Sequence, residues 1–183
     1  MRLSGSATVP LEIAEVWRRL DDPAELLRCT PGLVRLDPTS PDHYELALEL
    51  RLPALRGRFA GTVDVCERTA PERMRLALSG KGAPGFVEGE ATLQLVDAGL
   101  ATHVKWAAQV QVGGTIARLG QRMLSGVVLE MAAEFFSNLG NTDAASAPRA
   151  PAAGGPGRPA GLRAILRLLW RALRKRLGLS GSR

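Results

Sequence analysis

The sequence predicts an α+β domain, in which an antiparallel sheet is covered by one long helix, followed by a linker and a separate helix. Three observations support this: period-2 apolar segments over 44–112, a 3.6-residue apolar period over 115–139, and a stretch of Ala, Gly and Pro after it. Hydrophobic residues make up 45% of the 183 residues, which excludes a wholly disordered chain. We therefore expect a folded body at 1–140, a flexible linker at 141–161 and an amphipathic helix at 162–183.

The first elements are one strand and two short helices. Residues 1–10 alternate between apolar and polar, as a strand with one buried face does, and Pro10 ends them. In 11–20 the apolar residues recur at helical spacing, and Asp22-Pro23 is a typical start for a second helix over 24–29. Thr30-Pro31-Gly32 ends that helix.

Five strands then follow in series, separated by turn residues at Pro41-Asp42, Ala70-Pro71 and Asp97-Ala98-Gly99. Short connections of this kind predict hairpins and an antiparallel meander. The residues expected to face inward are Tyr44, Leu46, Leu48, Leu50 and Leu52; Phe59, Gly61, Val63 and Val65; Met74, Leu76 and Leu78; Ala91, Leu93 and Leu95; and Val104, Trp106, Ala108, Val110 and Val112.

A single helix is predicted over Thr115–Leu139. Its inward face would hold Ile116, Leu119, Met123, Val127, Met131, Phe135 and Leu139. Four glycines lie in or just before it, at 113, 114, 120 and 126, although each costs roughly 1 kcal/mol in a helix interior. They are explained either by a close approach of helix to sheet or by room for a ligand between the two.

The net charge of +6 is unevenly distributed along the chain. Residues 144–183 hold nine of the 24 basic residues and no acid, which leaves 15 basic and 18 acidic residues before them, a net charge of about −3. A nucleic-acid-binding domain would carry positive charge on its folded body. We therefore expect no nucleic-acid partner, and we assign the attraction to anions to the tail.

The tail segment predicts a helix with two opposed faces. We interpret it as a membrane-surface helix whose apolar face enters the lipid boundary while its arginines meet anionic headgroups. An arginine helix for RNA or protein, or a docking helix for a partner enzyme, stays open. The expected membrane contacts are Leu162, Arg163, Ile165, Leu166, Arg167, Leu169, Trp170, Arg171, Leu173 and Arg174.

No motif for catalysis or metal binding stands out. The two cysteines, Cys29 and Cys66, have no CxxC spacing, and phosphate-binding glycine loops are absent from the sequence. His43 and His103 lie at strand positions of outward parity without a partner motif. We therefore expect no catalytic residue, no metal and no covalent cofactor. With neither a secretory signal nor an apolar run long enough to span a bilayer, the expected location is cytoplasmic.

Three segments resemble a known family. They are DPAELLRCTPGL at 22–33, FVEGEATLQL at 86–95 and, most specifically, VQVGGTIARLGQRMLSG at 110–126, which is followed by MAAEFF. In this order they resemble the carbon monoxide dehydrogenase G-subunit family of the START-like (SRPBCC) superfamily, over about residues 1–140. The resemblance implies a helix-grip fold, in which a curved sheet wraps the long helix around an apolar cavity.

The resemblance also implies a non-catalytic accessory role. It predicts binding of a hydrophobic molecule, most simply menaquinone or ubiquinone, and association with a molybdenum hydroxylase of the CO dehydrogenase type. The protein would be peripheral on the inner face of the cytoplasmic membrane. The alternative is a START-like cyclase or hydrolase acting on a hydrophobic ring. The expected ligand contacts are Trp17, Phe59, Phe86, Trp106, Val110, Gly113, Leu119, Met123 and Val127.

Overall fold

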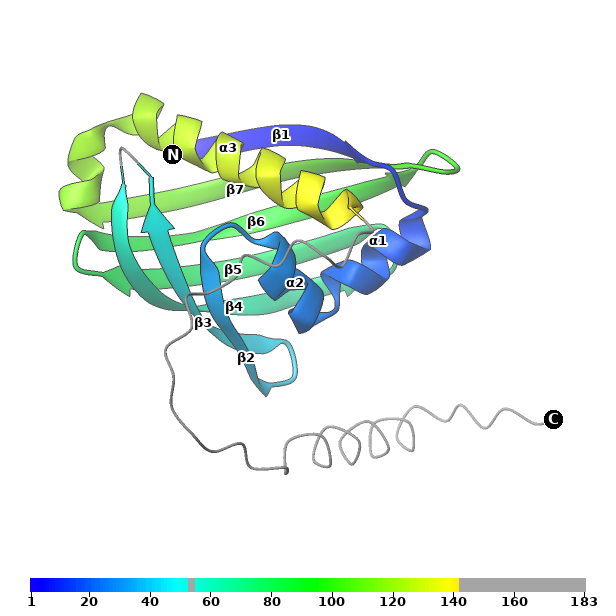
Figure 1. Cartoon of the computed structure of the whole chain (residues 1–183), viewed down its shortest axis with the longest axis horizontal. Helices are drawn as coiled ribbons and strands as arrows, with labels where there is room; N and C mark the ends of the chain where they lie inside the picture. Colours follow the sequence, from blue (N-terminus) through cyan, green and yellow to red (C-terminus); the bar gives the residue numbers. More distant parts are fainter. Residues whose placement is uncertain (53–54, 142–183) are drawn as a thin grey trace, which may run out of the picture. The chain divides into compact units, whose positions relative to one another are not determined.

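The computed structural model describes residues 1–52 and 55–141. Within them, one antiparallel sheet of seven strands in the order β1-β7-β6-β5-β4-β3-β2 curves beneath the helix α3 (Figure 1). The elements are β1 (Arg2–Val9), α1 (Ile13–Leu20), α2 (Pro23–Cys29), β2 (Leu33–Ser40), β3 (His43–Arg51), β4 (Arg56–Thr69), β5 (Arg73–Gly82), β6 (Gly85–Asp97), β7 (Thr102–Gly114), the 3-10 helix η1 (Thr115–Leu119) and α3 (Gln121–Gly140). The predicted α+β class, with an antiparallel sheet and a C-terminal helix, is confirmed.

The order of the strands follows from the short connections between them. Strands β2 to β7 pair with their sequence neighbours as a meander, and β1 closes the sheet by pairing with β7, with Leu3 opposite Ala108. Both helices between β1 and β2 lie on the same face of the sheet as α3 (Figure 1). We call this the inner face, and the opposite one the outer face.

The start of α2 is encoded locally, as predicted. The Asp22 carboxylate accepts a hydrogen bond from the Ala24 backbone N–H at 2.9 Å, and Pro23 occupies the first turn, where its missing N–H is not needed. The helix ends at Cys29, and Gly32 follows with a φ of 75°, a conformation that glycine adopts without strain.

Strand β2 is absent from the sequence-based prediction. It lies at the edge of the sheet, where only one side forms hydrogen bonds, and it contains Pro38. Its pairing with β3 is irregular at two points, and most of its side chains are exposed, including Val34 at 59%. An edge strand with little buried surface carries no period-2 signal, so the sequence pattern could not indicate it.

The predicted helix over 115–139 is interrupted. Residues Thr115–Leu119 form the 3-10 helix η1, Gly120 adopts φ 78° and ψ 153°, and α3 begins only at Gln121. That backbone conformation is accessible to glycine and ends any helix that reaches it. Within α3 the buried residues are Leu124, Phe136 and Leu139, and Met123, which was predicted to face inward, is exposed.

The main core lies at one end of the inner face, where α1, α2 and the last turns of α3 meet the sheet. Val9, Val16, Val104 and Leu139 are fully buried there, together with Cys29. Burying aliphatic side chains of this size stabilises the fold by about 1.5–3 kcal/mol each. This end of the sheet is therefore closed by packed side chains.

The predicted linker beyond Asn141 and the tail helix over 162–183 lie outside the described residues, as do the ten predicted membrane contacts. None of the helices within 1–52 and 55–141 has both the length and the apolar character that crossing a membrane requires.

Candidate functional site

The candidate site is the part of the inner face that the main core does not fill. Registered pairs of inward residues run across the middle strands: Leu46 opposite Gly61, Gly61 opposite Gly80, and Leu78 opposite Gly89. The inward positions here are Leu, Val and Gly, and their side chains are only half buried. We call this surface the inner groove, formed by Leu46, Leu48, Gly61, Val63, Leu78, Gly80, Val87, Gly89 and Val112.

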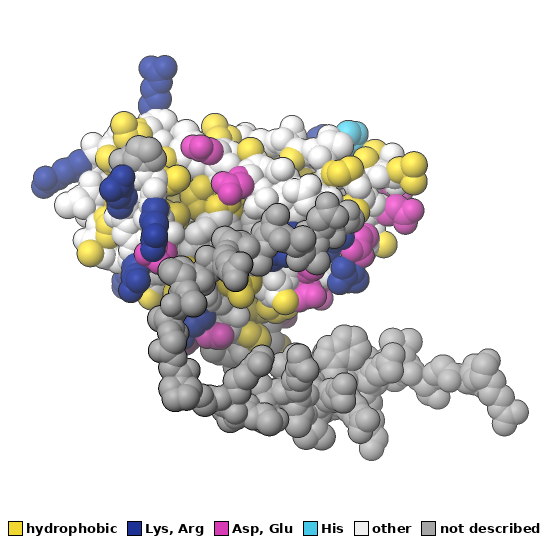
Figure 2. All heavy atoms as spheres, viewed as in Figure 1, with side chains coloured by type: hydrophobic (Ala, Val, Ile, Leu, Met, Phe, Trp, Pro, Cys, Tyr) yellow, Lys and Arg dark blue, Asp and Glu magenta, His cyan; other side chains and the backbone are white. Residues whose placement is uncertain are grey.

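Helix α3 forms the roof of the inner groove. Among the strands its backbone comes closest to β1, and it also packs on α1 and α2, so it is held along one side and at its C-terminal end. Its first turns contribute the half-buried Val127, Val128 and Met131. Figure 2 shows hydrophobic atoms exposed on this face between α3 and the strands below it. The apolar surface is thus open to solvent rather than sealed.

Glycines give the groove its curvature and its depth. A Cβ atom at Gly61 would collide with the backbone carbonyl of Ser79 on the neighbouring strand, so only glycine permits this close approach. At Gly80, in contrast, a Cβ would meet nothing nearer than the Ala60 carbonyl oxygen at 3.9 Å. Gly80 therefore leaves free space on the groove floor without being required by the backbone.

One end of the inner groove is polar. Tyr44 lies there on the inward side of β3, and Arg68 pairs across β4 and β5 with the inward Met74. The Arg68 guanidinium forms ion pairs with Asp42, at 2.7 Å, and with Asp21. The groove thus combines apolar walls with a hydroxyl and a charged group at the α1 end, where the polar part of an otherwise apolar ligand would find a partner.

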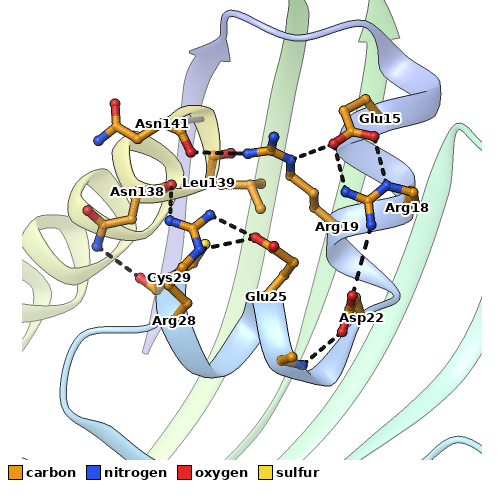
Figure 3. Close-up of polar contacts among 11 residues, drawn as sticks. Glu15, Arg18, Arg19, Asp22, Glu25, Arg28, Cys29, Asn138, Leu139 and Asn141 are labelled. Carbon is orange, nitrogen blue, oxygen red and sulfur yellow. Dashed lines mark hydrogen bonds and ion pairs between the residues drawn. The ribbon is translucent and has the colours of Figure 1, made fainter. Parts of the chain in front are cut away.

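A polar cluster fixes α3 to α1 and α2 at the same end (Figure 3). The buried Arg19 guanidinium donates to the backbone carbonyls of Leu139, at 2.8 Å, and Asn141, at 3.2 Å. Arg28 donates to the Asn138 carbonyl at 3.3 Å, and the Asn138 amide donates to the Cys29 carbonyl at 3.1 Å. The carbonyls at a helix C-terminus lack partners within the helix, so these cations stabilise the end of α3.

Glu15 orients both arginines of α1. Hydrogen bonds from Arg18, and then from Arg19, lower the pKa of the Glu15 carboxyl to about 2 from an ordinary 4.5. A carboxyl whose pKa is depressed in the folded state contributes stability that is present above pH 4.5 and is lost as the pH falls through about 2. Glu15 therefore stabilises the cluster at neutral pH.

We expect the acid sensitivity of the fold to depend in part on Glu15. The free energy of unfolding, measured by urea titration, should fall between pH 5 and pH 2.5, and it should fall less in the Glu15→Gln variant because that side chain has no proton to gain. Glu88→Gln is the matched control, since Glu88 is exposed on β6, away from this cluster. An equal fall in wild type and Glu15→Gln would contradict this role.

The predicted ligand contacts divide into three groups. Phe59 and Val110 are inward and buried, and Val127 and Leu119 are half buried on α3 and η1. Trp17 and Trp106 pack against the main core, with the Trp106 ring filling the space above Gly5. These six residues line or adjoin the inner face, whereas Phe86, Gly113 and Met123 do not.

The placement of Phe86 and Gly113 on the inner face is wrong. They are directly opposite each other on β6 and β7, at positions of the same parity as the exposed Glu88 and Gln111, and the Phe86 ring lies over Gly113 on the outer face. Met123 is 49% exposed, whereas its neighbour Leu124 is 6% exposed. Positions four apart advance about 40° beyond a full helical turn, so the predicted series from Met123 to Leu139 drifts around α3 and its first member leaves the buried face.

The sequence-based choice of site residues overlooked the aliphatic floor of the groove. Parity assigns Leu46, Leu48, Val63 and Leu78 to the inward face, but the expected ligand contacts do not include them. The parity signal was sufficient to find them. What it could not show is that the main core stops short of them.

The outer face of the described sheet also offers space to a ligand. A recess of about 410 Å³ lies on the outer face of β1, β7 and β6, and it is open and partly polar, with Arg2, Ser4, Glu90 and Gln109 among its lining. Within residues 1–52 and 55–141, no group of three His, Cys, Asp or Glu side chains is placed to hold a metal ion.

A curved antiparallel sheet wrapped around a C-terminal helix defines a START-like helix-grip protein. A START superfamily protein from Mycobacterium smegmatis shares this fold, with a TM-score of 0.60 and 12% identity over 76% of this chain and 94% of its own. The model of the carbon monoxide dehydrogenase G-subunit (CoxG) family matches residues 5–142, and the chain belongs to this family.

Two further solved structures are similar. A conserved protein from Geobacillus kaustophilus is 30% identical, with a TM-score of 0.74 over 76% of this chain and 93% of its own. The Zhui aromatase/cyclase from Streptomyces sp. R1128 has a TM-score of 0.57 at 11% identity, over 76% of this chain and 90% of that one. No curated relative matches the chain.

Proposed function

We propose that this protein is an accessory carrier that binds a hydrophobic small molecule in the inner groove for a membrane-linked oxidoreductase. The observation that supports the proposal is the half-exposed Leu, Val and Gly surface beneath α3, which adjoins a fully packed core. Apolar surface removed from water gains about 25 cal/mol per Å², so an apolar guest is favoured there. Membership of the CoxG family supports the accessory role.

The proposed ligand is an isoprenoid quinone, either menaquinone or ubiquinone. Its ring and chain match the aliphatic walls, and its carbonyl oxygens would accept hydrogen bonds from the Tyr44 hydroxyl and the nearby Arg68 at the polar end. In this orientation the chain runs along the groove floor, past Leu78 and Gly80, toward the opposite end of the strands.

The proposed partner is a molybdenum hydroxylase of the CO dehydrogenase type, in accordance with the family to which the chain belongs. The proposed location is the inner face of the cytoplasmic membrane. The basic segment over 162–183 would hold the protein there as an amphipathic surface helix, because nine cations and no acid occur in 144–183.

A cyclase or hydrolase acting on a hydrophobic ring is the second candidate. The similar fold of an aromatase/cyclase is the observation in its favour. Such chemistry needs an acid or base in reach of the substrate, and in this chain the Tyr44 and Arg68 end would have to supply it. Turnover of a polycyclic ring substrate that is lost in Tyr44→Phe would establish this candidate.

Reconstitution tests the carrier function. The purified hydroxylase, the substrate that it oxidises as electron donor, vesicles containing menaquinone, and this protein are combined, and quinone reduction is followed spectroscopically. We expect the full-length chain to accelerate quinone reduction. A chain lacking residues 160–183 should bind soluble quinone analogues normally but sediment poorly with anionic vesicles and transfer electrons more slowly, because the charge that holds it at the surface is removed.

Two outcomes would contradict the proposal. No effect of the full-length chain on the rate of quinone reduction would reject the carrier role. Equal sedimentation of the two chains with anionic vesicles would reject the tail as the membrane anchor. Ligand binding would be judged separately, by titrating the protein with soluble quinone analogues.

A further inference from the structure

Six exposed cations gather at the end of the sheet opposite α1. They lie at the ends of β3, β4 and β5, on η1 and on the first turn of α3, and Figure 2 shows dark blue side chains on this side of the molecule. We call this surface the basic end, formed by Arg51, Arg56, Arg58, Lys81, Arg118 and Arg122. They make up six of the 15 basic residues that precede residue 144.

The turn between β5 and β6 brings these elements together. The Pro84 carbonyl accepts hydrogen bonds from the Ile116 backbone N–H at 3.0 Å and from the Thr115 hydroxyl at 2.7 Å, which fixes η1 against the turn. A Cβ at Gly57 would lie 2.8 Å from the Pro84 ring, so the start of β4 packs on the same turn. The cations are therefore held on one rigid surface.

The basic end is strongly positive although the body as a whole is negative. Glu49 is the acid that lies among the cations; it pairs with Arg51 at 2.9 Å and approaches Arg58 at 3.7 Å. The Arg51 and Arg58 side chains nevertheless remain 77% and 84% exposed. The acids instead concentrate elsewhere, as at α1 and α2, where Glu15 and Glu25 pair with the arginines of their own helices.

Apolar side chains are interspersed with the cations. Met123 is 49% exposed on the first turn of α3, beside Arg122, and Leu55 and Leu119 are half buried next to Arg56 and Arg118. Exposed apolar groups flanked by long basic side chains are typical of surfaces that lie in the headgroup region of a bilayer, because the cations bind anionic headgroups while the apolar groups enter the boundary.

We propose that the basic end of the folded body docks on an anionic lipid surface. The inner groove lies next to this end, since Gly80 on its floor immediately precedes Lys81, and the buried Phe59, opposite Gly82, separates the two on the inner face. Docking therefore brings this end of the groove close to the bilayer. This contact is additional to the tail anchor of the proposed function. The docking proposal depends on that function only for the identity of the ligand. An apolar ligand that enters the groove at this end passes from lipid to groove without crossing bulk water.

Site-specific labels on the full-length chain test the contact. The exposed Cys66 is first replaced by serine, while the fully buried Cys29 stays. A nitroxide is attached through Met123→Cys at the basic end or through Leu100→Cys, which is 84% exposed at the far hairpin. With vesicles containing phosphatidylglycerol, we expect the label at 123 to become accessible to a lipid-soluble quencher and the label at 100 to stay accessible to a water-soluble one.

Charge reversal tests whether the cations of the basic end cause the contact with lipid. The triple variant Arg56→Glu, Arg118→Glu, Arg122→Glu should partition into phosphatidylglycerol vesicles about tenfold more weakly or worse, and its label at 123 should remain aqueous. The matched control reverses the same amount of charge elsewhere with Arg2→Glu, Arg73→Glu and Lys105→Glu, which are exposed outside the basic end. The control should lose clearly less affinity and keep the lipid contact at 123.

Three outcomes would overturn the docking proposal. A label at 123 that stays aqueous on vesicle-bound protein would show that the tail alone holds the membrane. Equally weakened vesicle binding in the two triple variants would show that the net charge, and not the basic end, determines the affinity. Protection at 123 that requires the hydroxylase and not the vesicles would assign the surface to a protein partner. Quinone titration without vesicles reports on the proposed function separately from all three.

Discussion

Replacing Gly80 with phenylalanine is expected to weaken ligand binding strongly without unfolding the protein. The new side chain points from near the C-terminal end of β5 into the inner groove, between Gly61 on one neighbouring strand and Val87 on the other. The backbone tolerates it, because a Cβ at position 80 has no close neighbour and phenylalanine favours strands. The ring would occupy the volume that we assign to the quinone.

The expected loss is large. Overpacking a fitted site costs about 1–3 kcal/mol, which corresponds to a 5- to 150-fold weaker dissociation constant. Isothermal titration with a short-chain quinone analogue measures this directly, and thermal unfolding of the same sample reports whether the fold is intact. A larger polycyclic substrate should be excluded in the same way, so the variant tests the site independently of the ligand's identity.

Ala77→Phe is the matched control. Position 77 lies on the same strand with the opposite parity, opposite the outward Asp64 and Glu90, so the same ring is added to the outer face. Normal binding by Ala77→Phe together with loss in Gly80→Phe would locate the ligand on the inner face. If both variants bind as tightly as wild type, the groove is not the binding site.

The sheet and its inward residues were predictable because each buried strand repeats every two residues. Val104, Trp106 and Val110 carry the signal on β7, and the structure places all three on the inner face. The same rule fails for β2, because an edge strand with few buried residues shows no alternation of apolar and polar positions. Periodicity thus detects burial, and it finds strands only where burial accompanies them.

The candidate site was only partly predictable, for two physical reasons. A spacing of four residues is longer than the 3.6-residue turn, so the predicted series from Met123 to Leu139 drifts by about 40° at each step and Met123 lies on the surface. Parity assigns a side to each residue but not the depth of packing, so the aliphatic floor around Leu78 looked like ordinary core. Depth depends on where α1, α2 and α3 stop, which is a property of the tertiary structure.

The distribution of charge was also hidden from composition. A body with a net charge of about −3 conceals the basic end, because β3, β5 and η1, which are distant in sequence, place Arg51, Lys81 and Arg118 at the same end of the sheet. Summed charge along the chain separates body from tail but cannot separate the two ends of a sheet. The strand register is what relates these residues.

Loss of the Arg19 guanidinium is expected to destabilise the fold more than the loss of any other single charged group on α1. In Arg19→Met the apolar stem is kept, but the carbonyls of Leu139 and Asn141 lose a donor and Glu15 loses its partner at 2.8 Å. Because the Arg19 side chain is only 10% exposed, water replaces these contacts poorly. We expect a loss of about 2–4 kcal/mol in the free energy of unfolding by urea.

Comparison with Arg18→Met distinguishes the effect of burial from the effect of charge on stability. Arg18 also pairs with Glu15 at 2.8 Å, but its side chain is 56% exposed, so water replaces the contact and its removal should cost much less stability than that of Arg19. Comparable losses in the two variants would show that the pairing with Glu15, and not the bonds to the end of α3, carries the stability. A larger loss in Arg19→Met would instead show that α1 holds the last turn of α3. The contact between Arg19 and the end of α3 would then determine the position of α3 over the inner groove. The Arg19→Met variant should therefore also weaken quinone binding.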